Sequence, residues 1–173
     1  MVLEAYQKVR SNKGSAGVDA IGMQEFDANR RKHLYKLWNR MASGSYFPPP
    51  VKEVEISKKD GSIRKLGIPT ISDRVGQMVV KMFIEPRLEA VFSPNSYGYR
   101  PKRSAHQALS KVRENCWKQN WVIDLDIKGF FDNIDHSKLM LAVEKHVPEN
   151  WVKFYIKRWL EAPVITKSGN LIE

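Results

Sequence analysis

The sequence feature that most constrains the fold is VIDLDIKGFFDNID, an apolar run at residues 122–135 that is interrupted by acid. Residues 121–127 are rich in aromatic and β-branched side chains, and this composition predicts a single buried strand. Asp124 and Asp126 are two residues apart, so both carboxylates should point to the same face of that strand. Burying an ionised carboxylate costs several kcal/mol unless a cation, a donor or water compensates. The stretch therefore predicts a strand whose acidic face needs a partner.

The carboxylates of this stretch have two interpretations. An Asp just before a helix often caps it, and an Asp at a strand end can accept a hydrogen bond from neighbouring backbone. This structural interpretation is favoured, residue by residue, for Asp124, Asp132 and Asp135. A divalent ion such as Mg²⁺ or Mn²⁺ is one cation that could compensate these carboxylates, because such hard ions select oxygen ligands and bridge them to substrate phosphates. Asp126 is excepted from the structural interpretation because of the residues that surround it.

Around this acidic stretch the chain is strongly basic, with 29 Lys and Arg against 19 Asp and Glu and a formal net charge of +10. The cations occur along most of the chain, interleaved with aromatic or apolar residues, as at 100–113 and 153–159. Charge spread through folded segments suits a polyanion that runs across a surface, and nucleic acid is the commonest one. The alternative is a face that is merely solvated.

Length and cysteine usage limit the class of protein. The 173 residues, 42% of them hydrophobic, can bury the core of one domain or of two small lobes. The single cysteine, Cys116, excludes an internal disulfide and suits a reducing compartment. No apolar run approaches the roughly 18 residues of a membrane span, and the N-terminus lacks the apolar block of a signal peptide. An intracellular, cytoplasmic protein with no membrane partner is expected.

Apolar periodicity predicts helices over most of the chain. One helix is expected to end near Gly44, a second should be kinked or interrupted at Pro86, and a third should begin with Ser104 as its cap. Two more are predicted near 137–146 and 148–160. The helix that ends near Gly44 is expected to bury Phe26, Leu34, Leu37, Trp38 and Met41.

One hairpin interrupts this helical pattern. Three consecutive prolines at 48–50 break the preceding helix because proline cannot donate a backbone hydrogen bond. Residues 51–56 then alternate apolar and charged, and Asp60-Gly61 precedes a second run, which predicts two antiparallel strands. The order of helix, hairpin, helices, strand and helices predicts an α+β chain.

Four segments together resemble a known family. LDIKGFFDNIDH at 125–136 resembles the first catalytic motif of the reverse transcriptases encoded by group II introns, the intron maturases. NKGSAGVD at 12–19 is similar to their N-terminal loop, which covers the template. EISKKDGSIRKLGIPTISDR at 55–74 resembles their fingers hairpin, and YGYRPKRSAHQAL at 97–109 resembles the next block. The order of these motifs identifies the chain as a member of this family.

The resemblance implies roles for the nucleotide site. Asp126 matches the catalytic, metal-binding aspartate, the backbone carbonyl of Ile127 matches a further ligand of Mg²⁺ or Mn²⁺, and Phe131 matches the aromatic that excludes a 2′-hydroxyl. Lys58 and Arg64 flank the Asp-Gly turn, at positions that grip the triphosphate in the family. An Arg fork can hold phosphate oxygens bidentately, whereas Lys acts as a point charge. The alternative is an ordinary charged edge hairpin.

The RNA contacts are predicted in two segments, the loop that resembles the template-covering loop of the family and a basic turn. Arg100, Lys102 and Arg103 bracket one proline, which favours phosphate contacts. Tyr97 and Tyr99 beside them could stack on bases or pack under the turn, and the sequence leaves both open. The candidate RNA-binding residues are Asn12, Lys13, Gly14, Arg100, Lys102 and Arg103.

The implied fold is that of a right-hand polymerase. Residues 1–98 are expected to form the fingers, and 99–173 the rest of the fingers with the start of the palm. The family's polymerase chemistry needs a second carboxylate motif, and this chain contains no Asp-Asp pair. The chain is therefore expected to be a fragment that is inactive alone. Its truncated palm would expose apolar surface, through which a homodimer could form.

The implied function is that of an RNA-directed DNA polymerase that copies intron RNA and assists splicing. Its partners would be intron RNA, an RNA template with a DNA primer, and deoxynucleoside triphosphates. Two alternatives stay open: a non-catalytic RNA-binding splicing cofactor, and the reverse transcriptase of another bacterial retroelement. An Asp-Asp motif further along the open reading frame would separate the enzyme from the cofactor.

Overall fold

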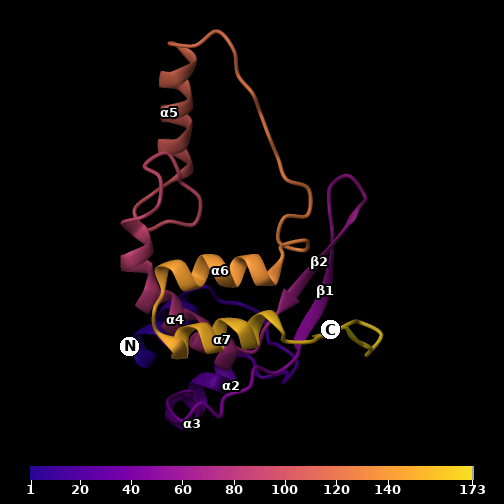
Figure 1. The fold of residues 1–173 in the computed structure, drawn as a ribbon. Helices are drawn as coiled ribbons and strands as arrows, with labels where there is room; N and C mark the ends of the chain where they lie inside the picture. The colour runs from indigo at the N-terminus through magenta and orange to yellow at the C-terminus, as the bar shows by residue number, and fades with distance from the viewer. Residues whose placement is uncertain (173) are drawn as a thin grey trace.

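The computed structural model describes residues 1–172, which form a helical body with a projecting hairpin and one long extended segment (Figure 1). The mixed α+β class predicted from the sequence is confirmed. The helices are α1 (Val2–Ser11), α2 (Met23–Ala28), α3 (Arg30–Ala42), α4 (Ile71–Glu89), α5 (Ala105–Cys116), α6 (His136–His146) and α7 (Asn150–Leu160). The strands are β1 (Val51–Ser57), β2 (Ile63–Ile68), β3 (Val164–Ile165) and β4 (Leu171–Ile172).

The core lies where α1, α3 and α7 pack around α4. Its buried residues are Ala5, Tyr6, Val9, Phe26, Leu37, Tyr46, Ile71, Val75, Val79 and Tyr155. A smaller cluster joins Val80 of α4 to Val147 and Val152 near the start of α7. No residue of α5 or α6 is fully buried, and α5 projects away from the body in Figure 1. The fully buried residues therefore come from α1, α2, α3, α4 and α7 and from the segments between them.

Helix α4 contributes to both clusters and begins with a side-chain cap. The Thr70 hydroxyl accepts a hydrogen bond from the Asp73 backbone N–H at 3.2 Å. The helix continues through Pro86 to Glu89, so the predicted interruption is not found. Pro86 lies in the last turn, where its missing N–H costs the helix a single hydrogen bond.

The region before the hairpin differs from the prediction in two respects. Phe26 belongs to a separate short helix, α2, and the longer helix α3 starts at Arg30. Leu37 is buried as expected, but Trp38 is 52% exposed and is not a core residue. Gly44 follows the end of α3 with a φ of +72°, a conformation that glycine adopts without strain.

The sheet has the order β2-β1-β3-β4, with β1 antiparallel to β2 and parallel to β3. The predicted hairpin is confirmed, and its turn contains Gly61 with a φ of +81°. The short pairing of Val51 with Val164 attaches the base of the hairpin to the segment that follows α7. This attachment fixes the direction in which the hairpin leaves the helical body.

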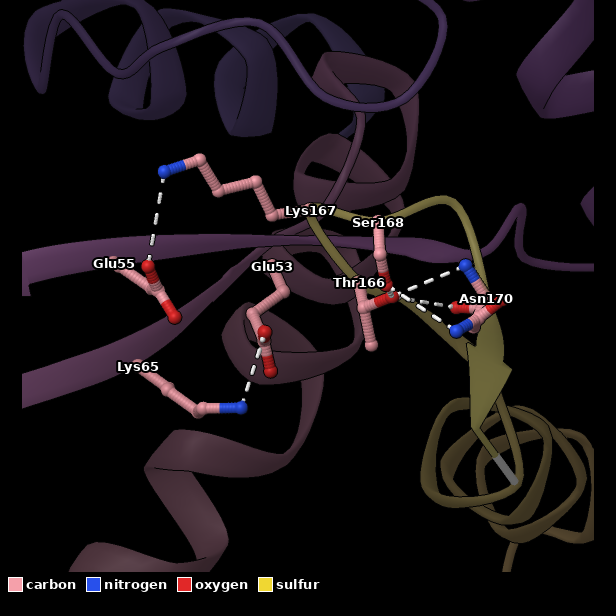
Figure 2. A network of polar contacts seen from close by, with 7 residues as sticks. All are labelled: Glu53, Glu55, Lys65, Thr166, Lys167, Ser168 and Asn170. Atoms are coloured by element: carbon pink, nitrogen blue, oxygen red, sulfur yellow. Dashed lines mark hydrogen bonds and ion pairs between the residues drawn. The ribbon is translucent and has the colours of Figure 1, made fainter.

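Ion pairs hold the base of the sheet on one face of β1, as Figure 2 shows. The Lys65 ammonium on β2 lies 3.3 Å from the Glu53 carboxylate, and Lys167 in the β3–β4 turn lies 3.8 Å from Glu55. The same turn is closed by the Asn170 backbone N–H, which donates to the Thr166 hydroxyl at 3.1 Å. Such exposed pairs are worth at most about 1 kcal/mol each, so their main effect is on register.

The strand predicted at 121–127 is not formed. These residues make an extended segment that returns from α5 toward the hairpin in Figure 1, and Leu125 is 87% exposed. A strand needs a neighbour to satisfy its backbone hydrogen bonds, and no described strand pairs with this segment. The prediction of a buried strand was wrong for residues 1–172 because it depended on a partner that composition cannot supply.

A buried carboxylate links three parts of the body. Asp73, in the first turn of α4, accepts hydrogen bonds from the Tyr46 hydroxyl at 2.9 Å and the Trp159 indole N–H at 2.7 Å. The Gln77 amide donates to its other oxygen at 3.2 Å. Burial raises the pKa of the Asp73 carboxyl, and the three donors oppose that shift. The network ties the segment before β1 and helix α7 to α4.

None of the helices described is long and apolar enough to cross a bilayer.

Candidate nucleotide and nucleic-acid site

A cleft of about 1220 Å³ separates the hairpin from the loop that precedes α6. Its volume exceeds that of most small-molecule pockets, so a nucleotide triphosphate fits within it. One wall comes from β1, β2 and their turn, and the other from residues 125–132. The cleft brings together the four residues that the resemblance assigned to nucleotide binding, Lys58, Arg64, Ile127 and Phe131, and the one that it assigned to catalysis and metal binding, Asp126.

The hairpin wall carries two cations on one face. Arg64 is paired with Ile56 in the β1–β2 register, and the Lys58 backbone N–H donates to the Ser62 carbonyl at 2.8 Å. Strand alternation therefore puts the side chains of Lys58 and Arg64 on the same face. Lys65, the next residue of β2, is paired with Glu53, and both of these residues also line the cleft. Neither Lys58 nor Arg64 forms an ion pair with any residue of 1–172, so both are available to an anion.

The opposite wall presents acid and an aromatic ring. Asp126 is exposed and makes no side-chain hydrogen bond or ion pair within the described chain. Gly129, with a φ of +61°, turns the loop, and the Asn133 amide donates to its carbonyl at 2.8 Å. This turn leaves the Phe131 ring exposed beside Phe130, with ring centroids 5.4 Å apart. A carboxylate and a flat apolar surface thus face the two cations across the cleft.

The other acidic residues of this stretch separate into two groups. Asp135 caps α6, and its carboxylate accepts from the backbone N–H groups of Ser137 at 2.9 Å and Lys138 at 3.1 Å. The capping interpretation is confirmed for this residue. Asp132 instead lines the cleft and makes no hydrogen bond within residues 1–172. Sequence reasoning missed it as a cleft residue, because spacing alone did not distinguish Asp132 from Asp135.

The oxygen ligands in the cleft are of the type that a hard divalent ion prefers, but they are too few to complete its coordination. Carboxylate and carbonyl oxygens such as those of Asp126 and Ile127 are the ligands that Mg²⁺ prefers. Among residues 1–172, no three His, Cys, Asp or Glu side chains are grouped so that they could hold a metal ion. These residues do not form a complete protein cage, and water and substrate phosphates would have to supply the remaining ligands.

The predicted RNA-binding residue Arg100 has an internal role in the structure. Its side chain is 7% exposed and forms a bidentate pair with Glu89, with Nη2 2.9 Å and Nε 3.1 Å from the carboxylate oxygens. Its Nη1 donates to the backbone carbonyls of Ser93 at 2.6 Å and Ser96 at 2.8 Å. The guanidinium therefore closes the loop after α4, and its donors are not free to bind phosphate.

The neighbouring cations are less enclosed than Arg100, although Arg103 is half-buried. Lys102 is exposed, and the Arg103 guanidinium lies 5.3 Å from the ring centroid of Tyr97. Tyr99 is 97% exposed, so the packing alternative does not hold for this ring. Lys102 and Arg103 are the two cations of the predicted cluster that a phosphate can reach.

The N-terminal loop is anchored to the start of α4. A side chain at Gly14 would lie 1.9 Å from the Arg74 guanidinium, and one at Gly17 would lie 2.7 Å from the Thr70 backbone. Arg74 also donates to the Ser15 carbonyl. Close approach to backbone therefore requires glycine at position 17, whereas the neighbour of Gly14 is the flexible end of the Arg74 side chain, which can move aside. Asn12 and Lys13 sit at the exposed corner of this loop, and the six predicted RNA contacts all lie outside the cleft.

Two cations, a carboxylate and an aromatic ring line one cleft, and this set of groups suits a phosphate-bearing nucleotide. The family described as "Reverse transcriptase (RNA-dependent DNA polymerase)" matches residues 56–172, and the chain belongs to this family.

Individual known proteins that resemble this chain indicate which members of the family it is similar to in kind. The "Group II intron-encoded protein LtrA" of Lactococcus lactis subsp. cremoris is 35% identical over 91% of this chain and 26% of its own length. "Protein YkfC" of Escherichia coli (strain K12) is 36% identical over 84% of this chain and 40% of its own length. "Nuclear intron maturase 1, mitochondrial" of Arabidopsis thaliana is 34% identical over 59% of this chain and 15% of its own length.

The predicted relationship to group II intron-encoded proteins and intron maturases is confirmed by these matches. The chain spans about a quarter of the length of the first of these relatives and less than half of the second.

Proposed function

We propose that this chain is the fingers and the first part of the palm of a group II intron maturase, an RNA-directed DNA polymerase that copies intron RNA and assists splicing. Residues 1–98 form the fingers, and residues 99–173 complete them and begin the palm. The observation that carries the proposal is the cleft, which joins Lys58 and Arg64 to Asp126 and Phe131 across two separate segments. The protein acts in the bacterial cytoplasm on intron RNA, a primed template and deoxynucleoside triphosphates.

Each wall of the cleft has a part in holding the nucleotide. Arg64 and Lys58 bind the triphosphate, the first as a fork and the second as a point charge. Phe131 presents its ring to the sugar and leaves no room for a 2′-hydroxyl. Asp126 and the Ile127 carbonyl hold Mg²⁺ or Mn²⁺ in the complete enzyme. Such an ion, when bound, neutralises phosphate charge next to the carboxylate.

Replacing Arg64 with Ala is expected to raise the KM for the incoming nucleotide in the complete enzyme by about ten- to a hundredfold, because hydrogen bonds to a charged group are worth about 1.5 to 3 kcal/mol. Single-nucleotide extension at varied nucleotide concentration measures this. Lys59→Ala is the matched control, since Lys59 is an exposed cation of the same hairpin turn that does not line the cleft. Equal KM values for the Arg64 variant and wild type would mean that Arg64 does not bind the nucleotide and that the hairpin is an ordinary charged edge.

RNA binding by this chain is expected to depend steeply on salt. Each neutralised phosphate contributes about 0.7 to 0.9 to the slope of log K against log salt, so five contacts would cost about two orders of magnitude on a fourfold increase. The double change Lys102→Ala/Arg103→Ala should lower that slope by about 1.5 and weaken binding to related and unrelated RNAs alike.

Salt titrations of wild type and the double variant measure these slopes, with Lys118→Ala/Lys145→Ala as the control, because both of these lysines are exposed and lie outside the basic turn. A variant whose slope equals that of wild type would show that Lys102 and Arg103 belong to a solvated surface.

A second function is favoured by the cations that lie outside the nucleotide cleft, such as Lys102 and Arg103, because RNA binding does not require the cleft. In this alternative the protein is a non-catalytic RNA-binding splicing cofactor that keeps the basic fingers of its family. Primer extension by the complete protein separates the two functions. Extension supports the polymerase, and RNA binding without extension supports the cofactor.

A further inference from the structure

Helix α3 exposes two aromatic rings that the core does not use. Tyr35 and Trp38 are 62% and 52% exposed, and their ring centroids lie 5.9 Å apart at an interplanar angle of 46°. Leu37, between them in sequence, faces the core and is buried. In Figure 1, α3 lies at the edge of the body, away from the loop that carries Asp126. The two rings form an exposed pair on an outer surface.

Cations surround this pair. Arg31 lies one turn before Tyr35 on the same stripe of the helix, and Lys32 and Lys36 lie on the adjacent stripe. All three are exposed, and none of them forms an ion pair or a side-chain hydrogen bond within residues 1–172. Their charges therefore remain uncompensated on the described protein surface.

The position of these cations weakens the helix that carries them. The first turn of α3 contains no acidic residue and begins with consecutive cations, which oppose the positive end of the helix dipole. Lys32 and Lys36 are also like charges at i and i+4, a spacing that costs a few tenths of a kcal/mol. Helix stability does not explain this arrangement, whereas an anionic partner does.

We propose that the outer face of α3, made by Arg31, Lys32, Tyr35, Lys36 and Trp38, binds unpaired nucleotides of an RNA strand. The bases stack on Tyr35 and Trp38, and the neighbouring phosphates contact the three cations. The proposal rests on the proposed function in taking RNA as the partner. It adds a surface that lies outside the nucleotide cleft and that no motif of the sequence indicated.

An unpaired strand fits this face better than the other polymers do. Each nucleotide offers one phosphate charge and one flat base, so a strand can satisfy cations and rings together. In duplex RNA the base faces are covered by their neighbours, and only the cations would find partners. A protein partner would need a dense cluster of acid to match three uncompensated cations.

The first test removes stacking while it keeps apolar area and helix propensity. Tyr35→Leu/Trp38→Leu is expected to weaken binding of a single-stranded RNA oligonucleotide at least about tenfold, and binding of a duplex of equal length by less than about twofold. Trp38→Phe, which keeps a ring, should retain most of the affinity. Equal losses on single-stranded and duplex RNA, or no loss on either, would overturn the stacking role.

The second test removes charge. Arg31→Ala/Lys32→Ala/Lys36→Ala should lower the salt slope for single-stranded RNA by about 2, since each contact to a single strand contributes about 0.7. The matched control, Lys118→Ala/Lys138→Ala/Lys145→Ala, makes the same charge change on exposed lysines elsewhere and should leave the slope nearly unchanged. The α3 variant should also melt at the same or a higher temperature than wild type, because it removes unfavourable dipole and like-charge terms.

The outcomes separate this inference from the proposed function. If wild type binds RNA and both α3 variants match it in affinity and slope, the α3 face is not an RNA-binding surface, and the proposed function still stands. The aromatic pair would then dock a protein. Wild type that binds no RNA at low salt overturns the RNA partner itself. A slope reduced in the α3 variant and kept in the control, with no loss of melting temperature, establishes the α3 face as an RNA-binding surface.

Discussion

Asp126→Asn is expected to abolish primer extension by the complete enzyme, with a loss of at least about three orders of magnitude, while RNA affinity stays nearly unchanged. The change keeps the size of the side chain and removes its charge. Asp126 is exposed in the cleft and is not used by any hydrogen bond or ion pair of the described chain, so its charge is free for a cation. Several kcal/mol of charge stabilisation correspond to this loss, because each 1.36 kcal/mol changes a rate tenfold.

The control for this change is Asp124→Asn. Asp124 lies two residues earlier in the same exposed segment and does not line the cleft, so extension should remain near the wild-type rate. Steady-state extension of a labelled primer, together with RNA affinity by filter binding, gives both quantities. If the Asp126 variant keeps its activity, the metal assignment is wrong, and Asp132→Asn becomes the next change to measure, since Asp132 is the other acid of that loop in the cleft.

Local signals in the sequence predicted the parts of this fold that local interactions decide. The Asp60-Gly61 turn, the Ser104 cap and the Asp135 cap all satisfy backbone groups within a few residues, and each is present in the structure. The hairpin between residues 51 and 68 follows from the same kind of signal. Turn and cap chemistry is legible in a sequence because donor and acceptor are close along the chain.

The predictions that failed depended on distant partners. The strand at 121–127 lacked a neighbour among the described strands. Trp38 lies on the solvent side of α3, whereas Leu37 of the same helix faces the core. Arg100 looked like its neighbours Lys102 and Arg103, yet only Arg100 reaches Glu89. A family resemblance named residues of the cleft from the sequence. The sequence did not show that the hairpin and the 125–132 loop line one cleft in the described chain.

The Asp73 network gives the largest expected effect on stability. Asp73→Ala should lower the free energy of unfolding by at least about 3 kcal/mol, because it leaves the Tyr46 hydroxyl, the Trp159 indole N–H and the Gln77 amide without their acceptor. Asp73→Asn keeps an oxygen for Tyr46 and Trp159, and Gln77 can turn its amide to accept from the new nitrogen. The Asn variant should therefore be far more stable than the Ala variant at every pH.

The pH dependence tests the physical state of the carboxyl itself. Burial raises the pKa of Asp73 above its ordinary value of 3.8, so the folded chain holds this proton more tightly than the unfolded chain does. The associated stability is fully present below the unfolded pKa and is lost as the pH rises through the raised folded pKa. Asn carries no such proton, so the stability of Asp73→Asn relative to wild type should increase across that window and then level off.

Urea denaturation of both proteins at a series of pH values measures this difference. Hydrogen bonds from Lys118 and Lys111 lower the pKa of Glu114 to about 2, so this group changes stability with pH in the opposite direction. Such groups are present in both proteins, and their contributions cancel in the difference. Asp124→Asn, an exposed change outside the network, should run parallel to wild type at every pH. A constant difference between Asp73→Asn and wild type would mean that the Asp73 proton is held equally in the folded and unfolded chains, and that the three donors offset its burial completely.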